Sequence, residues 1–146
     1  PPFETIKPLP DSGITPWVRQ YQFRFVEGAP SYGNGPRDTL GSAYSRMWLS
    51  DAPPRRIDAL SLLSMCDTFF ARIFHVRGEI VPIGTVTMTN MFHADAADLA
   101  AENTTMVLGA ADARRFHKSF SDQTGELWSP SGRLLATTSQ TVYFKA

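Results

Sequence analysis

The most constraining stretch of the chain covers residues 55–74, because its large apolar residues do not keep to one side of a helix. At helical spacing they occupy the whole circumference, as Ile57, Leu60, Leu62, Leu63, Met65, Cys66, Phe69, Phe70, Ile73 and Phe74. A helix that is apolar all round has to be covered on every side. We therefore predict one continuous, buried helix of about five or six turns, ended by Gly78.

A membrane span is the other way to satisfy such a helix, but the stretch suits it poorly. Asp67 interrupts the apolar run, and its first four positions carry three charges, so it falls short of the roughly 20 apolar residues that a span needs. Asp67 is the one charged residue between Asp58 and Arg72. A buried carboxylate without a partner costs several kcal/mol or takes up a proton. Asp67 is therefore either paired locally, with a hydroxyl or an arginine, or kept for chemistry.

Composition excludes several classes of function. The 146 residues, 42% of them hydrophobic, suit one globular domain. Fourteen basic residues balance fourteen acidic ones without a basic block, which argues against nucleic-acid binding. The single cysteine, Cys66, leaves no disulfide or Cys-rich metal site within this sequence and fits a core position in a reducing compartment, here the cytoplasm. Common nucleophile, nucleotide and zinc motifs do not occur.

Alternating apolar and polar residues predict a series of strands. We expect them at residues 17–27, 43–49 and 84–92, as one or two strands over 104–122, at 125–128 and at 134–144, with a turn at 130–133. Residues 28–41 read as a long loop, and 50–54 offer capping residues and prolines for the helix start. One curved antiparallel sheet around one long central helix is the economical packing. This α+β architecture is the hotdog fold.

Two strands carry polar residues of interest. Strict alternation over 84–92 would place Thr85 on the same face as Thr87 and Thr89. On the last strand, Gln140 shares a face with apolar neighbours such as Ala136 and Val142. A polar amide among apolar side chains is a second anomaly beside Asp67.

Three features together resemble one known family. They are Asp67 in the apolar helix, the strand start Gly84-Thr85-Val86, and the terminal segment in which Gly-Glu-Leu-Trp (125–128) and Gly-Arg-Leu-Leu-Ala (132–136) precede Gln140. The chain resembles the C-terminal hotdog of acyl-CoA thioesterase II-like (TesB-like) enzymes. The resemblance implies hydrolysis of a fatty acyl-CoA to free acid and CoA. It also implies two hotdogs in tandem, with residues 1–14 as a linker or leader and 15–146 as one hotdog domain.

The resemblance also assigns roles to residues. It implies that Asp67 activates the attacking water as a base, and that Thr85 and Gln140 bind and orient this water. No metal or other cofactor is implied, and the expected partners are the acyl-CoA substrate and a second hotdog, with no nucleic acid or membrane. Two positions depart from the family pattern: Ala71 stands where a proline is common, and Thr87-Met88 where Asp-His or Asp-Leu is common.

Two alternatives of other classes stay open. One is a non-catalytic hotdog that binds acyl groups or completes a dimer, in which Thr85 is an ordinary strand residue and Gln140 ties strands together. The other is a hotdog enoyl-CoA hydratase, which needs an Asp/His pair in the groove; His93 and His117 are the candidates. Thiol release from acyl-CoA, against addition of water to a crotonyl-type substrate, separates the three.

Overall fold

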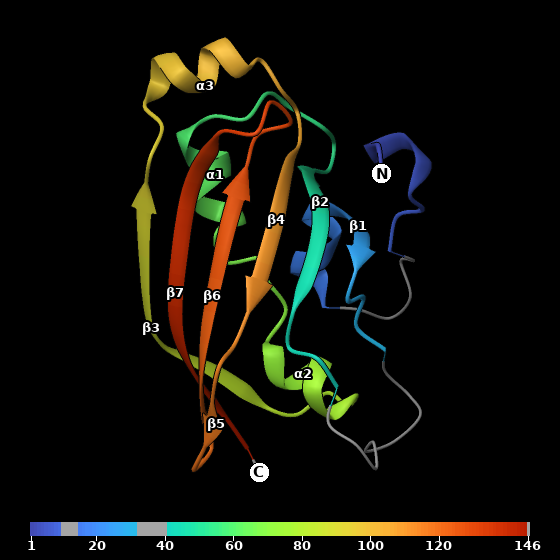
Figure 1. Cartoon of the computed structure of the whole chain (residues 1–146), viewed down its shortest axis with the longest axis vertical. Coiled ribbons are helices and arrows are strands. Elements are labelled where there is room, and N and C mark those ends of the chain that lie inside the picture. Colours follow the sequence, from blue (N-terminus) through green and yellow to red (C-terminus); the bar gives the residue numbers. More distant parts are fainter. Residues whose placement is uncertain (10–14, 32–40, 146) are drawn as a thin grey trace.

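The computed structural model describes residues 1–9, 15–31 and 41–145. Figure 1 shows the arrangement of the helices and strands. In chain order they are the 3-10 helices η1 (Phe3–Thr5) and η2 (Pro16–Gln20), strands β1 (Tyr21–Glu27) and β2 (Ser45–Asp51), helices α1 (Ala59–Met65) and α2 (Arg72–Arg77), strand β3 (Ile83–Phe92), helix α3 (Ala96–Glu102), and strands β4 (Val107–Asp112), β5 (Phe116–His117), β6 (Phe120–Trp128) and β7 (Leu134–Phe144).

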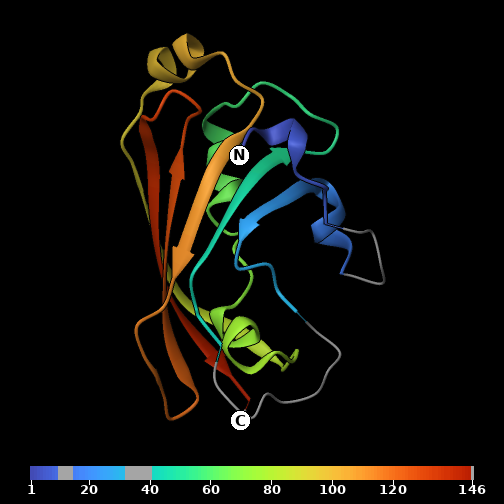
Figure 2. The same ribbon diagram turned by 45° about the vertical axis from the view of Figure 1, so that its right-hand side comes forward.

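The strands form one antiparallel sheet in the order β1-β2-β4-β6-β7-β3, with the short β5 paired to β6. Strands β1 and β3 are therefore the two edges of the main path. The sheet curls so that α1 and α2 lie on its concave side (Figure 2). This arrangement confirms the predicted hotdog fold.

Alternation along the strands places one apolar face against the helices. On β7 every second residue from Ala136 to Phe144 is buried, so Gln140 has the apolar neighbours that the sequence predicted. On β1, Phe23 is buried, and Tyr21 and Phe25 pack against the same core. The largest fully buried apolar side chains of this core are Phe23, Met47, Leu49, Leu62, Met65, Leu127 and Leu135.

The central helix is not continuous, and the prediction of a single helix over residues 55–74 is wrong. α1 begins after the N-cap Asp58 and ends at Met65, and α2 begins at Arg72, so residues 66–71 lie between the two helices. The connecting residues include Ala71, whose ψ of 126° is not helical. Gly78, in the left-handed conformation with φ of 74°, ends α2 as predicted.

One local hydrogen bond and one contact with the sheet explain why the helix breaks. The Thr68 hydroxyl donates to the carbonyl of Met65 at 2.8 Å, a local bond that competes with helical pairing. The Phe69 ring lies on the sheet directly over Gly109 and Gly125, where a Cβ atom would be 2.9 and 2.5 Å from the ring. The two glycines leave a depression in the sheet, and the backbone departs from the helical path so that the Phe69 ring can fill it. Tertiary packing thus overrides a helical pattern in the sequence.

The helix is also less completely covered than expected. Leu60 and Leu63 on α1 keep 72% and 46% of their surface exposed, whereas Leu62 and Met65 are fully buried. Among the residues that the structure describes, the sheet therefore covers only one side of α1. The exposed side is an apolar surface that a further protein segment could cover.

Other boundaries differ by a few residues. Residues 17–20 belong to η2, and the strand begins at Tyr21. β2 extends to Asp51. The N-cap of α1 is Asp58, not one of residues 50–54 as predicted. The region 104–122 divides into β4, β5 and the start of β6. The turn at 130–133 is confirmed, and the long loop at 28–41 falls largely outside the described residues.

Helix α3 was not predicted, although its signals are present in the sequence. Asp95 and Asp98 form a reciprocal capping box, and four of the seven residues of α3 are alanine. The Arg133 side chain pairs with Asp98 and, at 3.5 Å, with Glu102. These contacts hold α3 over the β6–β7 turn, away from the concave side.

The first nine residues lie along the β1 edge. The Leu9 amide donates to the carbonyl of Phe23 at 2.7 Å, and the Arg24 guanidinium donates to the carbonyl of Ile6 at 2.7 Å and stacks on the Phe3 ring. The indole of Trp48 on β2 donates to the carbonyl of Pro1. Among the helices of the described residues, none has the length and apolarity of a membrane span.

Candidate functional site

A groove of about 1250 Å³ opens on the concave side, where the chain passes from α1 to α2. One wall comes from η2 and β1 and the other from β3, and the floor is made by β6, β7 and the helix break. The side chains that line it are Leu9, Thr15, Trp17, Tyr21, Pro30, Leu63, Ser64, Asp67, Thr68, Phe69, Phe70, Ala71, Phe74, Ile80, Val81, Ile83, Thr85, Met88, Asn90, Gln123, Gln140 and Val142. Most are apolar, and the polar ones include Asp67, Thr85 and Gln140.

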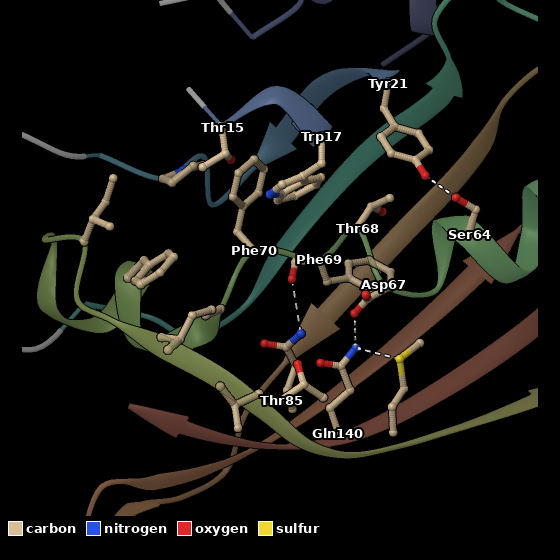
Figure 3. A pocket seen from close by; sticks show the side chains of 18 of the residues that line it. Thr15, Trp17, Tyr21, Ser64, Asp67, Thr68, Phe69, Phe70, Thr85 and Gln140 are labelled. Atoms are coloured by element: carbon tan, nitrogen blue, oxygen red, sulfur yellow. Dashed lines mark hydrogen bonds between the residues drawn. The ribbon is translucent and has the colours of Figure 1, made fainter. Parts of the chain in front are cut away.

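Asp67 and Gln140 meet in the middle of this groove. The Gln140 amide nitrogen donates to a carboxylate oxygen of Asp67 at 3.1 Å and approaches the Met88 sulfur at 3.5 Å (Figure 3). Gln140 is 5% exposed, so its side chain is fixed by packing as well as by this bond. The structure thus brings together two of the three residues singled out in the sequence, 73 positions apart.

Asp67 is not a buried acid, and that prediction is wrong. It follows α1 at the break in the helix, where its side chain turns into the groove and stays exposed. The residues around it, Met65, Cys66 and Thr68, are buried. Because the helix ends at Met65, Asp67 is released from the apolar core and becomes accessible to a ligand or to water.

Thr85 reaches the same groove from β3, on the opposite wall (Figure 3). The pairing of β3 with β7 contains a bulge at this point, because Thr85 lies opposite Val142 and Thr87 lies opposite the adjacent Thr141. The extra residue reverses the alternation. Thr85 and Met88 therefore share the groove face, and the prediction that Thr87 lies on the face of Thr85 is wrong.

Gln123 on β6 was missed in the sequence. Its amide nitrogen donates to the carbonyl of Phe69 at 3.2 Å, and its amide oxygen accepts from the backbone N–H of Arg72 at 3.2 Å. With 2% exposure, it holds the second half of the break that carries Asp67, from Phe69 to the start of α2. A glutamine at a buried strand position was the signal that could have identified it.

Further groups complete the helix break. The buried Arg72 guanidinium donates to the carbonyl of Phe70 at 2.8 Å and to the Ser45 hydroxyl at 2.6 Å, so it anchors the start of α2 to β2. At the mouth of the groove, the hydroxyls of Tyr21 and Ser64 share a short hydrogen bond (Figure 3). Trp17 packs on Phe70 with ring centroids 5.6 Å apart. These contacts fix the aromatic wall opposite β3.

The positions that depart from the family pattern are also located. Met88 lies opposite Gln140 in register, and its sulfur contacts the Gln140 amide. A thioether therefore lies beside Gln140 at the position where the family pattern has His or Leu. Ala71 is the N-cap residue of α2. His93, bonded to the Thr137 hydroxyl, and His117, on β5, do not line the groove. An Asp/His pair of the hydratase kind is therefore not formed by these residues.

The charged groups of the site are few. In the part of the chain that the structure describes, no cluster of His, Cys, Asp and Glu could hold a metal ion. Burial of the Cys66 thiol, and then the negative charge of the adjacent Asp67, raise its pKa to about 11. Cys66 is thus a protonated core residue, as the sequence predicted, and not a nucleophile.

The polar groups of the groove could activate a water molecule. A carboxylate, an amide donor and a hydroxyl face a mostly apolar groove. An ionised carboxylate accepts hydrogen bonds and protons, and the amide and hydroxyl groups can position a water molecule beside it. Such a group can deprotonate water next to a bound apolar molecule.

Solved structures support the fold. A conserved protein of unknown function with a hot dog fold from Alicyclobacillus acidocaldarius is 37% identical to this chain, with a TM-score of 0.89. The alignment covers 100% of this chain and 53% of that one. The tesB protein of Mycobacterium avium subspecies paratuberculosis is 18% identical, with a TM-score of 0.64 and coverage of 96% and 54%. The acyl-CoA thioesterase II TesB2 of Mycobacterium marinum is 15% identical, with a TM-score of 0.57 and coverage of 99% and 54%.

The chain thus spans about half the length of these three structures. A comparison with curated proteins finds no match. The model of the acyl-CoA thioesterase C-terminal domain family, in contrast, matches residues 2–144, which is nearly the whole chain. This chain therefore belongs to the acyl-CoA thioesterase C-terminal domain family.

Proposed function

We propose that this chain is the catalytic C-terminal hotdog of an acyl-CoA thioesterase that hydrolyses a fatty acyl-CoA to free acid and CoA. The observation that carries the proposal is the hydrogen bond between Gln140 and Asp67 inside a mostly apolar groove. Thr85 faces the same groove from the other wall. Family membership supports the same activity.

In the proposed mechanism Asp67 is the general base. A water molecule held by Asp67, Thr85 and Gln140 attacks the thioester carbonyl carbon while the carboxylate takes its proton. Gln140 also has amide hydrogens that could stabilise the negative charge on the carbonyl oxygen. The leaving thiolate needs little acid assistance, because a thiol has a pKa of about 8.5. A covalent enzyme intermediate is not required.

We propose further that residues 15–146 act together with a second hotdog, and that residues 1–14 connect the two. Three observations support this arrangement. The relatives are about twice as long as this chain. Leu60 and Leu63 expose apolar surface on α1. The edge strand β3 leaves backbone groups unpaired on its outer side, which a second sheet could use.

The test is thiol release from acyl-CoA substrates of graded chain length, using the full-length polypeptide. Asp67→Asn keeps an oxygen that accepts the Gln140 hydrogen bond but removes the basic carboxylate. We expect it to lower kcat by at least 100-fold, in the range of general-base catalysis. Glu126→Gln, which changes an exposed carboxylate on the outer face of β6, is the matched control and should keep the wild-type rate.

Full activity of Asp67→Asn would refute the mechanism. If neither the wild-type protein nor any variant released thiol, while acyl-CoA still bound, the chain would be a non-catalytic acyl-binding hotdog. Addition of water to a crotonyl-type substrate would instead identify a hydratase.

A further inference from the structure

Two polar side chains lie opposite each other on β3 and β7, and each has an oxygen atom without a hydrogen-bond partner. Asn90 lies opposite Thr138 in register. The Oδ1 atom of Asn90 and the Oγ1 atom of Thr138 are both shielded from solvent, and neither has a hydrogen-bond partner in the structure. Thr138 is 4% exposed and belongs to the floor of the sheet, whereas Asn90 lines the groove. Of the two side chains, Asn90 is therefore the one that lies beside a ligand bound in the groove.

The groove has two chemically different ends on either side of Asp67. Strand β3 begins beside α2 and ends near α1 (Figure 1). At the α2 end the groove is lined by the apolar residues Phe74, Ile80, Val81 and Ile83. At the α1 end the lining includes Leu63 but also the polar groups of Tyr21, Ser64 and Asn90. An acyl chain prefers the first end, and a polar arm prefers the second.

We propose that Asn90 binds the pantetheine arm of the acyl-CoA substrate, by accepting a hydrogen bond from the amide nitrogen nearest the thioester sulfur. The proposal rests on the proposed thioesterase function and deepens it, because it assigns the two ends of the groove. The acyl chain lies toward α2, and the CoA side lies toward α1. Oδ1 is shielded in the free structure, so binding requires the Asn90 amide to turn toward the groove. This turn breaks no hydrogen bond of Oδ1, and a ligand N–H then gives the oxygen a partner, which stabilises the complex.

The spacing along the strand agrees with this assignment. Met88, which contacts Gln140, and Asn90 are two residues apart on β3, or about 7 Å at the usual rise of a strand. In a CoA thioester, four bonds separate the carbonyl carbon from the first amide nitrogen, which spans about 5 Å when extended. A thioester carbonyl near Gln140 thus brings that amide within hydrogen-bond reach of Asn90. The groove volume of about 1250 Å³ exceeds the range usual for a small ligand and leaves room for both parts.

Two substrates with the same acyl group test the proposal in the full-length polypeptide. An acyl-N-acetylcysteamine thioester carries the first amide of pantetheine, and an alkyl thioester of matched length has methylene groups in its place. Asn90→Leu should lower kcat/KM about tenfold for the first substrate and not for the second. Asn90→Asp keeps an acceptor oxygen and should keep the preference for the amide. Thr89→Val, on the outer face of the same strand, is the control and should behave as wild type.

Equal effects of Asn90→Leu on both substrates, or no effect on either, would overturn the assignment. A residue that only binds water or only stabilises the strand would not distinguish the substrate with the amide from the one without it. If Asn90→Leu does not fold, Asn90→Ala takes its place. Binding of pantetheine itself, followed by calorimetry, separates this proposal from the proposed function. Binding that depends on Asn90 in a protein without hydrolase activity would support the site and refute the reaction.

Discussion

Gln123 and Gln140 lie directly opposite each other on β6 and β7, and each holds a different part of the same segment. Gln123 bonds to the backbone of Phe69 and Arg72, and Gln140 bonds to the carboxylate of Asp67. The sheet thus supplies one amide that shapes the helix break and one that meets the acid which the break exposes. The position of Asp67 depends on both.

Replacing Gln123 by Met should therefore affect stability and catalysis together. Met fills similar space but leaves the Phe69 carbonyl and the Arg72 N–H without their partner, which costs about 1–3 kcal/mol of the free energy of unfolding. Asp67 then loses its fixed position, so we expect kcat to fall while KM changes less. Chemical denaturation and steady-state kinetics measure the two effects. Gln22→Met, on the edge strand β1 outside the groove, is the control; an unchanged kcat in a destabilised Gln123→Met would show that Gln123 is structural only.

Because of the bulge in β3, we predict different effects for the same substitution at Thr85 and at Thr87. Thr85 faces the groove, whereas Thr87, after the bulge, faces away. Thr85→Val removes a hydroxyl from the proposed water site and should lower kcat about tenfold, the loss of one hydrogen bond. Thr87→Val should leave kcat within twofold. The reverse order, measured by thiol release, would mean that the strand is in another register.

Gly125 should not tolerate a side chain. A Cβ atom there would lie 2.5 Å from the Phe69 ring and 2.8 Å from the Thr138 methyl group. Gly125→Ala should lower the free energy of unfolding by about 1–3 kcal/mol, as overpacking does, and disturb the helix break through Phe69. Gly84→Ala is the matched control, because nothing lies within 4 Å of its Cβ position. Thermal or denaturant unfolding of both variants checks the difference.

The sequence predicted the parts of the fold that depend on local pattern. β7 was located to the residue, since alternation over 134–144 is clear, and Gly78 ends α2 as expected. The break between α1 and α2 could not be predicted, because it depends on Gly109, Gly125 and Gln123, which are distant in the sequence. No local pattern in residues 55–74 reports the depression that receives the Phe69 ring.

The sequence identified residues of the candidate site, but it did not predict the exposure of Asp67 or the strand bulge beside Thr85. Asp67 and Gln140 were both identified as polar residues among apolar ones, and they meet in the groove. The expected burial of Asp67 was wrong because it assumed a continuous helix. Thr85 was identified only through the resemblance, because a bulge cannot be recognised in alternating threonines. Asn90 could not be identified from the sequence, because its unpartnered oxygen opposite Thr138 is visible only in the structure.

The Cys66 thiol predicts a pH dependence of stability. Its pKa of about 11 in the folded protein exceeds the ordinary value of 9.0, mainly because the thiol is buried. Above pH 9 the unfolded chain loses the proton more readily than the folded protein, so stability falls as the pH rises toward 11. We expect Cys66 to contribute a loss of about 2 kcal/mol over this interval. Because lysines and tyrosines titrate in the same range, the measurement is the difference in unfolding free energy between wild type and Cys66→Ala. A difference that stays constant from pH 8 to 11 would mean that the thiol is not desolvated.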